Sequence, residues 1–349
     1  MRHILEKLYS KNSLTREELL YLLDKLEEDG RDYLYSLAYN TTLKTYGNRI
    51  FVRGLLEFTN YCKNNCKYCG LRRDNKKIER YRLSKEEILA SLEEGNKLGY
   101  KTFVLQGGED PYYTDEILID IVKTIKSKYK DVAVTLSIGE RSRGSYEKLY
   151  QAGVDRFLLR HETATKNLYH SLHEGMSLEK RMECLFNLKE IGYQVGTGFL
   201  VGLPGESKES LVDNLLFLKR LQPAMVGIGP LISHPDTPLR GFNNGSVETT
   251  LKMISLTRLL LPNALIPATT ALNTLSKEGL ERGILAGANV VMLNLSPVEI
   301  RRKYELYKNK EITDAHQIRK IEDRVKKVNF QVDMGRGDHI KYNRRVNNV

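Results

Sequence analysis

Three closely spaced cysteines are the residues of this chain whose type and spacing point most directly to chemistry. Cys62, Cys66 and Cys69 fall within eight residues of a chain that holds only four cysteines. Thiolates clustered in this way are soft ligands that suit iron–sulfur clusters, copper(I) or zinc. A cubane iron–sulfur cluster normally takes four thiolates, so three cysteines leave one iron open for a small molecule. The spacing therefore predicts an iron–sulfur cluster with a reactive open position.

Two other uses of these cysteines are weaker. A structural zinc site would need a fourth ligand, and the next histidine after the cysteines, His161, is about ninety residues away. Three close cysteines cannot all pair as disulfides, and nothing in the sequence suggests export. The remaining cysteine, Cys184, is interpreted as a small buried hydrophobic residue and not as a fourth ligand.

The alternation of short β-branched runs with helical patterns predicts a parallel α/β fold. Capping boxes such as Ser84 with Glu87 mark helix starts, and glycines such as Gly99 and Gly192 are typical of left-handed helix ends. Eight strands with crossover helices predict a closed (β/α)8 barrel of the TIM type. The predicted strands are Arg53–Phe58, Thr102–Leu105, Ala133–Leu136, Arg156–Leu159, Gln194–Val201, Met225–Gly229, Leu265–Ala268 and Val290–Leu293.

The segments outside the barrel are predicted to be mainly helical. Residues 15–26 and 31–45 precede the first strand, and residues 297–307 and 313–328 follow the last. The last twenty residues are polar and contain glycine, which predicts a poorly specified tail. We therefore divide the chain into an N-terminal helical extension (1–47), a barrel (48–308) and a C-terminal helix and tail (309–349).

In such barrels the reactive residues lie at the carboxyl ends of the strands and in the loops that follow. The cysteines follow the first strand, and residues 106–109, Gln-Gly-Gly-Glu, follow the second, where glycines let the backbone approach a ligand. Thr135 and Ser137 share one face of the third strand, and their hydroxyls either bind a ligand or fill the barrel. Arg160 and Glu162 share one face of the fourth strand. Arg160 suits an anion, and Glu162 suits a hydroxyl or an ammonium group. The alternative is that the two residues form a structural ion pair with each other.

The overall composition narrows the class of protein. A net charge of +11 raises the question of nucleic acid, but the basic residues are interleaved with acidic ones along helices, which is typical of solvated faces. No apolar run is long enough to span a membrane, and the N-terminus lacks the apolar core of a signal peptide. We therefore expect a cytoplasmic protein that binds neither nucleic acid nor membrane.

The cysteine run, with Tyr68 just before the last cysteine, resembles the radical S-adenosylmethionine (SAM) superfamily. The motifs at 106–109, 198–206 and 227–229 resemble that superfamily's SAM-contacting segments. The resemblance implies that SAM binds the open iron of a 4Fe-4S cluster through its amino and carboxylate groups. One electron from the cluster then cleaves SAM to methionine and a 5′-deoxyadenosyl radical.

A closer resemblance, from about residue 45 to residue 308, is to the HydE family of FeFe-hydrogenase maturases. It rests on six motifs in this order: Cys62–Asn75, Leu105–Tyr113, Leu159–Thr163, Val226–Pro230, His234–Pro238 and Ile266–Thr270. The resemblance implies SAM contacts at Gln106, Gly107, Gly108, Glu109, Ser137, Glu162, Arg181 and Gly227. It implies a catalytic cavity lined by Thr135, Arg160, Met225, Thr269, Thr270, Met292 and Tyr307.

The family resemblance also implies a substrate and partners. The substrate would be a cysteine-bound iron complex with CO and cyanide ligands, which is anionic and suits Arg160 and the two threonines. The expected partners are a tyrosine-cleaving radical SAM maturase, a GTPase scaffold and a reductant such as ferredoxin or flavodoxin. Some members carry a second cluster on three cysteines after the position of Tyr307. Residues 308–326 contain no cysteine here, so we expect one cluster.

Other functions remain open from the sequence. The nearest enzymatic alternatives are a radical SAM mutase of the methylornithine synthase type, from the pyrrolysine pathway, and sulfur chemistry like that of biotin synthase. A non-enzymatic alternative is an iron–sulfur electron carrier, which would neither respond to SAM nor consume it.

Overall fold

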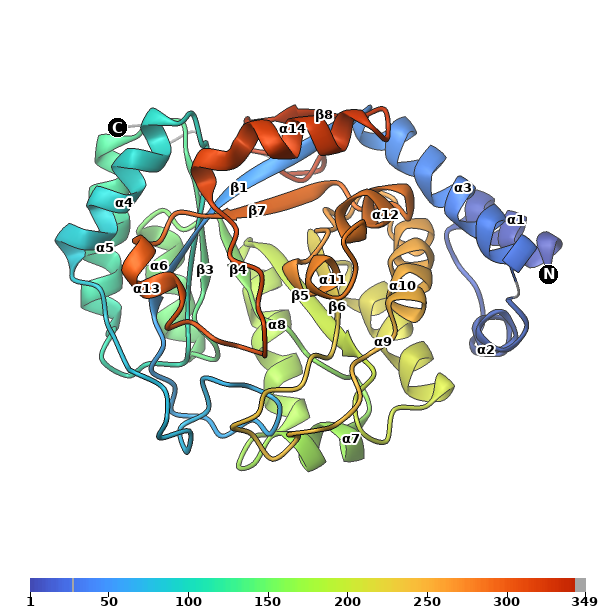
Figure 1. Ribbon diagram of the computed structural model, residues 1–349, viewed down its shortest axis with the longest axis horizontal. Helices are drawn as coiled ribbons and strands as arrows, with labels where there is room; N and C mark the ends of the chain where they lie inside the picture. The colour runs from blue at the N-terminus through green and yellow to red at the C-terminus, as the bar shows by residue number, and fades with distance from the viewer. Residues whose placement is uncertain (27, 343–349) are drawn as a thin grey trace.

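A curled parallel sheet forms the centre of the structure, a computed structural model that describes residues 1–26 and 28–342. Seven strands follow the order β6-β5-β4-β3-β2-β1-β7, and β8 pairs with the start of β1 (Figure 1). The strands are β1 Arg49–Thr59, β2 Thr102–Gly107, β3 Ala133–Ser137, β4 Arg156–Leu158, β5 Gln194–Val201, β6 Met225–Pro230, β7 Val290–Asn294 and β8 Gln331–Asp333. The TIM-type fold class predicted from the sequence is thereby confirmed.

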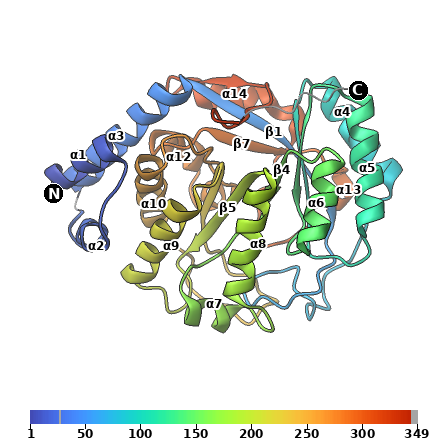
Figure 2. The same cartoon turned by 180° about the vertical axis from the view of Figure 1, so that it is seen from behind.

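Helices lie along the outside of this sheet (Figures 1 and 2). The helices that precede β5 in the chain are α1 Arg2–Lys11, α2 Arg16–Lys25, α3 Glu28–Tyr46, α4 Lys85–Lys97, α5 Asp115–Lys128, α6 Arg143–Gln151, α7 Lys166–Leu172 and α8 Leu178–Ile191. Those that follow are α9 Lys208–Leu221, α10 Val247–Leu260, α11 Thr270–Leu275, α12 Gly279–Leu285, α13 Val298–Arg301, the 3-10 helix η1 Ala315–Gln317 and α14 Ile318–Lys326. Among the described residues, no helix is long and apolar enough to cross a membrane.

The predicted helix signals are confirmed by the structure. The Ser84 side chain accepts from the Glu87 backbone N–H, and Glu87 accepts in return from Ser84, which completes a capping box at α4. At the other end of a helix, Gly192 closes α8 with φ 106°, a left-handed conformation that favours glycine. These local signals fix where each crossover helix begins and ends.

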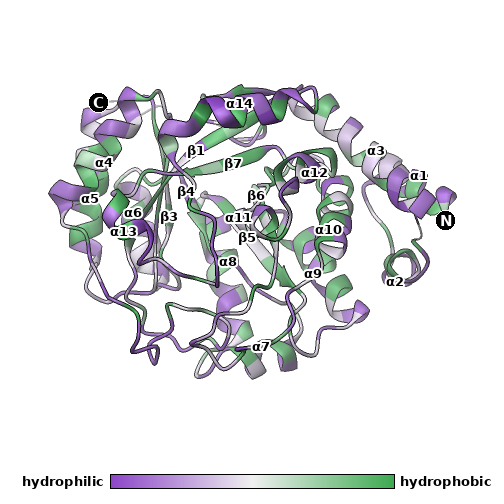
Figure 3. Cartoon of the chain, viewed as in Figure 1, coloured by the Kyte–Doolittle hydropathy of each residue, from purple (hydrophilic) through white to green (hydrophobic). Residues whose placement is uncertain are grey.

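Burial explains why the strands lie where they do. Ten of the eleven residues of β1 are buried or half-buried, as expected for a strand of a parallel sheet that is covered on both faces. Figure 3 shows β1 and β7 as hydrophobic, whereas the outer helix α14 is largely hydrophilic. The strand register then aligns the carboxyl ends, because Glu57 of β1 pairs with Gln106 of β2, and Gln106 pairs with Ser137 of β3.

The prediction of a full seventh strand at residues 265–268 is wrong. This segment forms only two single-residue bridges, Leu265 with Met225 of β6 and Pro267 with Val290 of β7. Proline has no backbone N–H to donate to a ladder, which limits pairing at this point. The sheet is therefore closed between β6 and β7 by isolated bridges instead of a strand.

The C-terminal part of the chain also differs from the prediction. The helix predicted over residues 297–307 is limited to the single turn of α13, and the irregular segment that follows brings Tyr304 and Tyr307 to a cavity at the open end of the barrel. The predicted loose tail instead forms β8 and places Arg336, which is only 8% exposed, at the opposite end of the barrel. The rest of that predicted tail, residues 343–349, lies outside the described residues.

A buried ion-pair network explains why this segment is ordered. The Asp338 carboxylate lies 2.7 Å from the Arg156 guanidinium of β4 and 2.9 Å from Arg336. Arg336 also lies 3.1 Å from Asp155. Arg156 and Asp155 are distant in sequence from the tail, so the local pattern of the tail gives no sign of them.

Candidate active site

The carboxyl ends of β1 to β6 surround a cavity of about 290 Å³. The segment after α13 closes one side of it through Tyr304 and Tyr307. Most of the predicted site residues line this one cavity: Cys62, Cys66, Cys69, Gln106, Gly107, Gly108, Glu109, Ser137, Arg160, Glu162, Arg181, Thr269 and Tyr307. Their functional roles stay predictions, but the fold brings all of them to the wall of one cavity.

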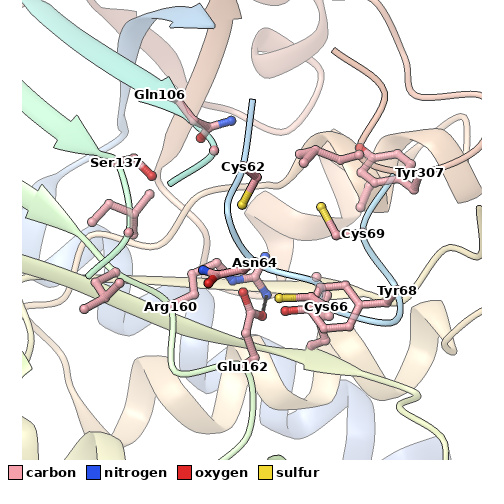
Figure 4. A pocket seen from close by; sticks show the side chains of 18 of the residues that line it. Cys62, Asn64, Cys66, Tyr68, Cys69, Gln106, Ser137, Arg160, Glu162 and Tyr307 are labelled. Atoms are coloured by element: carbon pink, nitrogen blue, oxygen red, sulfur yellow. Dashed lines mark ion pairs between the residues drawn. The ribbon is translucent and has the colours of Figure 1, made fainter. Parts of the chain in front are cut away.

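The three cysteines lie in the irregular loop after β1 and border the cavity (Figure 4). Burial, followed by the neighbouring Cys62 thiol, raises the pKa of Cys69 to about 12. Burial likewise raises the pKa of Cys62 and of Cys66. A thiolate is therefore disfavoured here unless a metal centre compensates its charge.

The set of thiols at the cavity fits a cluster with an open position. Cys62, Cys66 and Cys69 all line the cavity, and a cubane cluster that normally takes four thiolates keeps one iron open when it has three. Cys184, as predicted, is buried in α8 and does not line the cavity. The three remaining thiols fit a 4Fe-4S cluster with one open iron.

Gly108 allows the cysteine loop to pack against the end of β2. A Cβ atom at this position would lie 2.2 Å from the Tyr61 carbonyl oxygen and 2.7 Å from the Cys62 Cβ. Contacts that short force something to move, and here the neighbours are backbone and a cluster ligand. The backbone of Lys63 also donates to the Glu109 carbonyl at 2.9 Å. Gly108 is therefore required for the cysteine loop to lie close to the end of β2, whether or not it also contacts SAM.

Arg181 is buried, although an exposed surface position is the default for an arginine. Its Nε donates to Glu140 at 2.6 Å, and its Nη2 lies 3.7 Å from the Glu109 carboxylate. Gly139, at φ +78°, permits this cluster, because a Cβ there would lie 1.7 Å from the Glu109 side chain. Glu140 was missed by the sequence reasoning. Its signal was its place next to Gly139 after the third strand.

Arg160 and Glu162 both line the cavity just beyond β4, which ends at Leu158 (Figure 4). The predicted shared orientation is observed, but Glu162 has φ 62°, so strand alternation is not its cause. Their charged groups lie 3.3 Å apart, yet Arg160 Nε, Arg160 Nη2 and Glu162 Oε2 have no hydrogen-bond partner among the described residues. Buried polar atoms without partners are costly, so these atoms retain the capacity to bind a ligand. His161 faces the other way, with its Nδ1 2.9 Å from Thr197 Oγ1, and burial lowers its pKa to about 3.

Tyr68 and His173 form a hydrogen bond that the sequence did not reveal. The Tyr68 hydroxyl lies 2.9 Å from His173 Nε2, and His173 Nδ1 lies 2.8 Å from the Tyr169 carbonyl. A carbonyl only accepts, so Nδ1 carries the proton and Nε2 accepts from Tyr68. Burial lowers the pKa of His173 to about 4, which keeps the ring neutral. This contact fixes an aromatic ring between two cysteines on the cavity wall.

Five predicted residues do not line the main cavity: Thr135, Met225, Gly227, Thr270 and Met292. Thr135 and Met225 instead border a separate space of about 10 Å³, deeper in the barrel, together with Arg53 and Arg156. Thr135 Oγ1 has no partner there. The sequence gives the alternation of side chains along a strand, but it does not give how deep each one lies, so it merged two layers of the barrel into one.

Arg53 is a further residue that the sequence reasoning missed. It is 1% exposed, its Nη1 lies 2.7 Å from Met225 Sδ, and its Nε and Nη2 have no partner among the described residues. The available signal was an arginine within the mainly apolar strand β1, whose other buried charged residue is Glu57. The small space beside it therefore suits an anion or a water molecule.

Comparisons with known proteins agree with this geometry. Residues 56–218 match the family described as the Radical SAM superfamily. The chain is 49% identical to the FeFe hydrogenase maturase subunit HydE of Thermotoga maritima over 309 residues. The aligned region covers 88% of each chain. It is 32% identical over 288 residues to the 3-methylornithine synthase of Methanosarcina acetivorans, covering 82% of this chain and 81% of that one.

Solved structures show the same fold. The crystal structure of methylornithine synthase (PylB) aligns with a TM-score of 0.83 at 28% identity, over 95% of this chain and 97% of that chain. A structure of HydG, a maturase of the FeFe hydrogenase, aligns with a TM-score of 0.81 over 95% of this chain and 75% of that chain. At 24% identity, the latter supports the fold alone.

The fold and the three-cysteine site thus define a radical SAM enzyme, whose cofactors are a 4Fe-4S cluster and SAM. The chain belongs to the radical SAM superfamily and, within it, to the family of the FeFe hydrogenase maturase subunit HydE.

Proposed function

We propose that this protein acts in FeFe-hydrogenase maturation, where it uses SAM to process a cysteine-bound iron complex that carries CO and cyanide ligands. The observation that carries the proposal is the 49% identity to the Thermotoga maritima maturase over 88% of both chains. Arg160 supports the proposed substrate class, because a guanidinium suits an anionic complex and Arg160 lines the cavity. Its Nη2 forms an ion pair with Glu162 at 3.3 Å, but its Nε and Nη2 have no hydrogen-bond partner among the described residues.

In this proposal the chain divides the cavity between cofactor and substrate. When bound, the cluster supplies one electron that cleaves SAM to methionine and a 5′-deoxyadenosyl radical. Cys62, Cys66 and Cys69 hold the cluster, and the β2 end with Ser137, Glu162 and Arg181 orients SAM. Arg160 and Thr269 hold the substrate on the far side. Tyr307, whose pKa burial raises, limits the access of water from the C-terminal segment.

Thr135, Met225 and Arg53 form the floor in this proposal. They border the small deep space and not the main cavity. Arg53 gives this floor a positive charge. Gly227 of β6 and Met292 of β7 belong to the barrel wall, and Thr270 begins α11. The proposed partners are a tyrosine-cleaving maturase that supplies the iron complex, a GTPase scaffold that accepts the product, and ferredoxin or flavodoxin as reductant.

The test begins with anaerobically reconstituted protein reduced with dithionite. Its EPR spectrum is recorded with and without SAM, and 5′-deoxyadenosine is then assayed. A spectrum changed by SAM, with 5′-deoxyadenosine formed, supports SAM cleavage at an open iron. A cluster indifferent to SAM supports the electron-carrier alternative. Addition of the iron complex should then increase 5′-deoxyadenosine formation and consume the complex.

A second candidate is a mutase of the methylornithine synthase type. It is favoured by the 32% identity to the Methanosarcina enzyme and by the close structural match to PylB. The same reconstituted protein, incubated with lysine and SAM, separates the two candidates by mass spectrometry. Formation of methylornithine would reject the hydrogenase-maturation proposal.

A further inference from the structure

Arg80 ties together the two ends of the loop that carries the cysteines. Its Nη1 donates to the carbonyl of Asn60 and, at 2.9 Å, to that of Leu71. Its Nη2 donates to the carbonyls of Arg72 and Asn75 at 2.7 Å and 3.2 Å. Asn60 comes before the first cysteine, and the other three residues come after the last. One side chain therefore closes the loop around the cluster site from behind.

Only arginine can make this set of contacts. The loop between β1 and residue 81 has no helix or strand, so its carbonyls must find donors elsewhere. A guanidinium offers five N–H donors in a rigid planar fork, whereas a lysine ammonium is a compact group that cannot span four separated carbonyls. Arg80 does not line the cavity, so its role does not include direct contact with SAM or substrate.

The charge of Arg80 lies close to the chain positions of two cluster ligands. Its Nη1 donates to the carbonyl of Asn60, two residues before Cys62, and to that of Leu71, two residues after Cys69. Its hydrogen-bond acceptors are neutral carbonyls. By contrast, Arg82 makes a bidentate pair with Asp110 at 2.7 Å and 2.9 Å, which neutralises it.

We propose that Arg80 is a positioning residue that shapes the cysteine loop before the cluster is inserted and raises the reduction potential of the cluster once it is bound. The proposal rests on the cluster site described above. Reduction adds one electron to the cluster and makes it more negative, and nearby charge is one of the features that set cluster potentials. A fixed cation beside two of the three thiolates therefore favours the reduced state.

Two substitutions separate the two roles. Arg80→Lys keeps the positive charge but loses most of the carbonyl contacts, and Arg80→Met loses both. The matched control is Arg73→Met, which removes a charge from the same loop at an exposed position. Arg73 pairs there with Asp74 and makes one long hydrogen bond, 3.4 Å, to a loop carbonyl, that of Lys63. Hydrogen–deuterium exchange of residues 60–76 is measured in the cluster-free proteins. Iron loss to a chelator and the reduction potential, by EPR-monitored titration with dithionite, are measured in the reconstituted proteins.

The expected results differ between the variants. Both Arg80 variants should exchange faster in the loop and lose iron about tenfold faster, the factor expected for the loss of one or two net hydrogen bonds. Arg80→Met should also shift the potential to a more negative value, whereas Arg80→Lys and Arg73→Met should keep it near that of the unchanged protein. Equal exchange and equal iron loss in Arg80→Lys and Arg73→Met would overturn the positioning role.

An unchanged potential in Arg80→Met would overturn the electrostatic role. If Arg80→Met takes up no cluster, its exchange data and the comparison of Arg80→Lys with Arg73→Met still decide the positioning role. In that case Arg80→Gln, which is neutral but retains a donor, replaces it in the titration. None of these measurements requires SAM or substrate. A failure of the proposed function would be seen in a different experiment, the EPR test, as a cluster whose spectrum does not respond to SAM.

Discussion

At the scale of single residues, the end of β4 shows how the fold prepares a binding group. Glu162 has φ 62°, in the left-handed region that non-glycine residues rarely adopt. This conformation accompanies the turn that leaves both Arg160 and Glu162 facing the cavity while His161 is buried behind them. Backbone strain of this kind persists where the surrounding structure requires it, and it is frequent at functional sites.

Replacement of Cys66 by alanine tests the cluster assignment. Cys66 is the central cysteine of the run, and the loss of one of only three ligands leaves the cluster with two. We expect Cys66→Ala to bind almost no iron after reconstitution and to form no 5′-deoxyadenosine. Cys184→Ala is the control, because Cys184 is buried in α8 away from the cavity, and it should retain both properties. Iron content and SAM cleavage are measured together. Retained cleavage in Cys66→Ala would contradict the ligand assignment.

Replacement of Arg160 by alanine tests the substrate side of the cavity. Since the Arg160 guanidinium is expected to bind substrate and not SAM, we expect SAM still to change the EPR spectrum of Arg160→Ala. Turnover of the iron complex should fall by about 10² to 10³, as for other lost electrostatic contacts in a closed site. Calorimetry of SAM binding and a substrate assay provide the two readouts. A large loss of SAM affinity would instead place Arg160 in the cofactor site.

At the scale of elements, the site depends on close packing of loops that follow different strands. The cysteine loop after β1 lies against the β2 end at Gly108 and against the C-terminal segment, where Gly70 N–H donates to the Leu306 carbonyl at 2.9 Å. The β3 end joins through Gly139 and Glu109. Each loop is irregular alone, and each is ordered by its neighbours.

Gly108→Ala tests this dependence. The added methyl group would meet the Tyr61 carbonyl and the Cys62 Cβ, so the cysteine loop must move. We expect reduced iron content and faster iron loss, with a melting temperature that falls by only a few degrees for about 1 kcal/mol of strain. Gly144→Ala in α6 is the control, because a Cβ there meets nothing within 4 Å. That change should stabilise the helix slightly and leave the iron content unchanged.

The turn after β5 should make stability depend on pH. Burial raises the pKa of Glu206 to about 7 from an ordinary 4.5, although its carboxylate accepts the Gly202 N–H at 2.9 Å. A raised pKa in the folded state means that the stabilising contribution is full below about pH 4.5 and is lost as the pH rises through 7. Between pH 4.5 and pH 7 the free energy of unfolding of the unchanged protein should fall by about 3 kcal/mol relative to that of Glu206→Gln. Urea unfolding of the cluster-free proteins across the interval measures this difference. Parallel pH profiles would contradict it.

At the scale of the whole molecule, the two ends of the barrel have opposite roles. The open end carries the cavity, and the other end is closed by β8 and the residues after it (Figure 1). The closing segment brings Asp338 to Arg156, whose side chain is 4% exposed. The ion pair therefore holds a charge inside the barrel that the apolar strands alone could not accommodate.

Asp338→Asn tests this closure. The substitution keeps the shape of the side chain but leaves Arg156 and Arg336 without their shared carboxylate. Breaking a buried pair from one side typically costs about 3 to 5 kcal/mol of unfolding free energy. The control is Asp333→Asn in β8, which weakens the half-exposed contact with Arg49 at 3.5 Å and should cost about 0 to 1 kcal/mol. The asparagine oxygen can still accept from the Gly335 N–H, as Asp333 does at 2.7 Å. Urea unfolding of both variants provides the comparison, and equal losses would contradict the proposed role of Asp338.

The sequence by itself determined the chemistry and the order of the elements. The cysteine spacing, the capping signals and most of the strands are local, because ligand type, hydrogen bonds to nearby backbone and side-chain periodicity depend on residues close together in the chain. Arg160 and Glu162 both face the cavity as predicted, but they do so from a turn beyond β4 and not from one face of the strand.

Only the tertiary structure decided depth and long-range partners. It separated Thr135 and Met225 from the main cavity, buried Arg181 between two carboxylates, and paired His173 with Tyr68. It also reduced the predicted seventh strand to two bridges and ordered the predicted tail through Asp338. These outcomes depend on contacts between residues far apart in sequence. The energy of burying a polar or charged group is set by which partners the whole fold brings to it, and no local pattern contains that information.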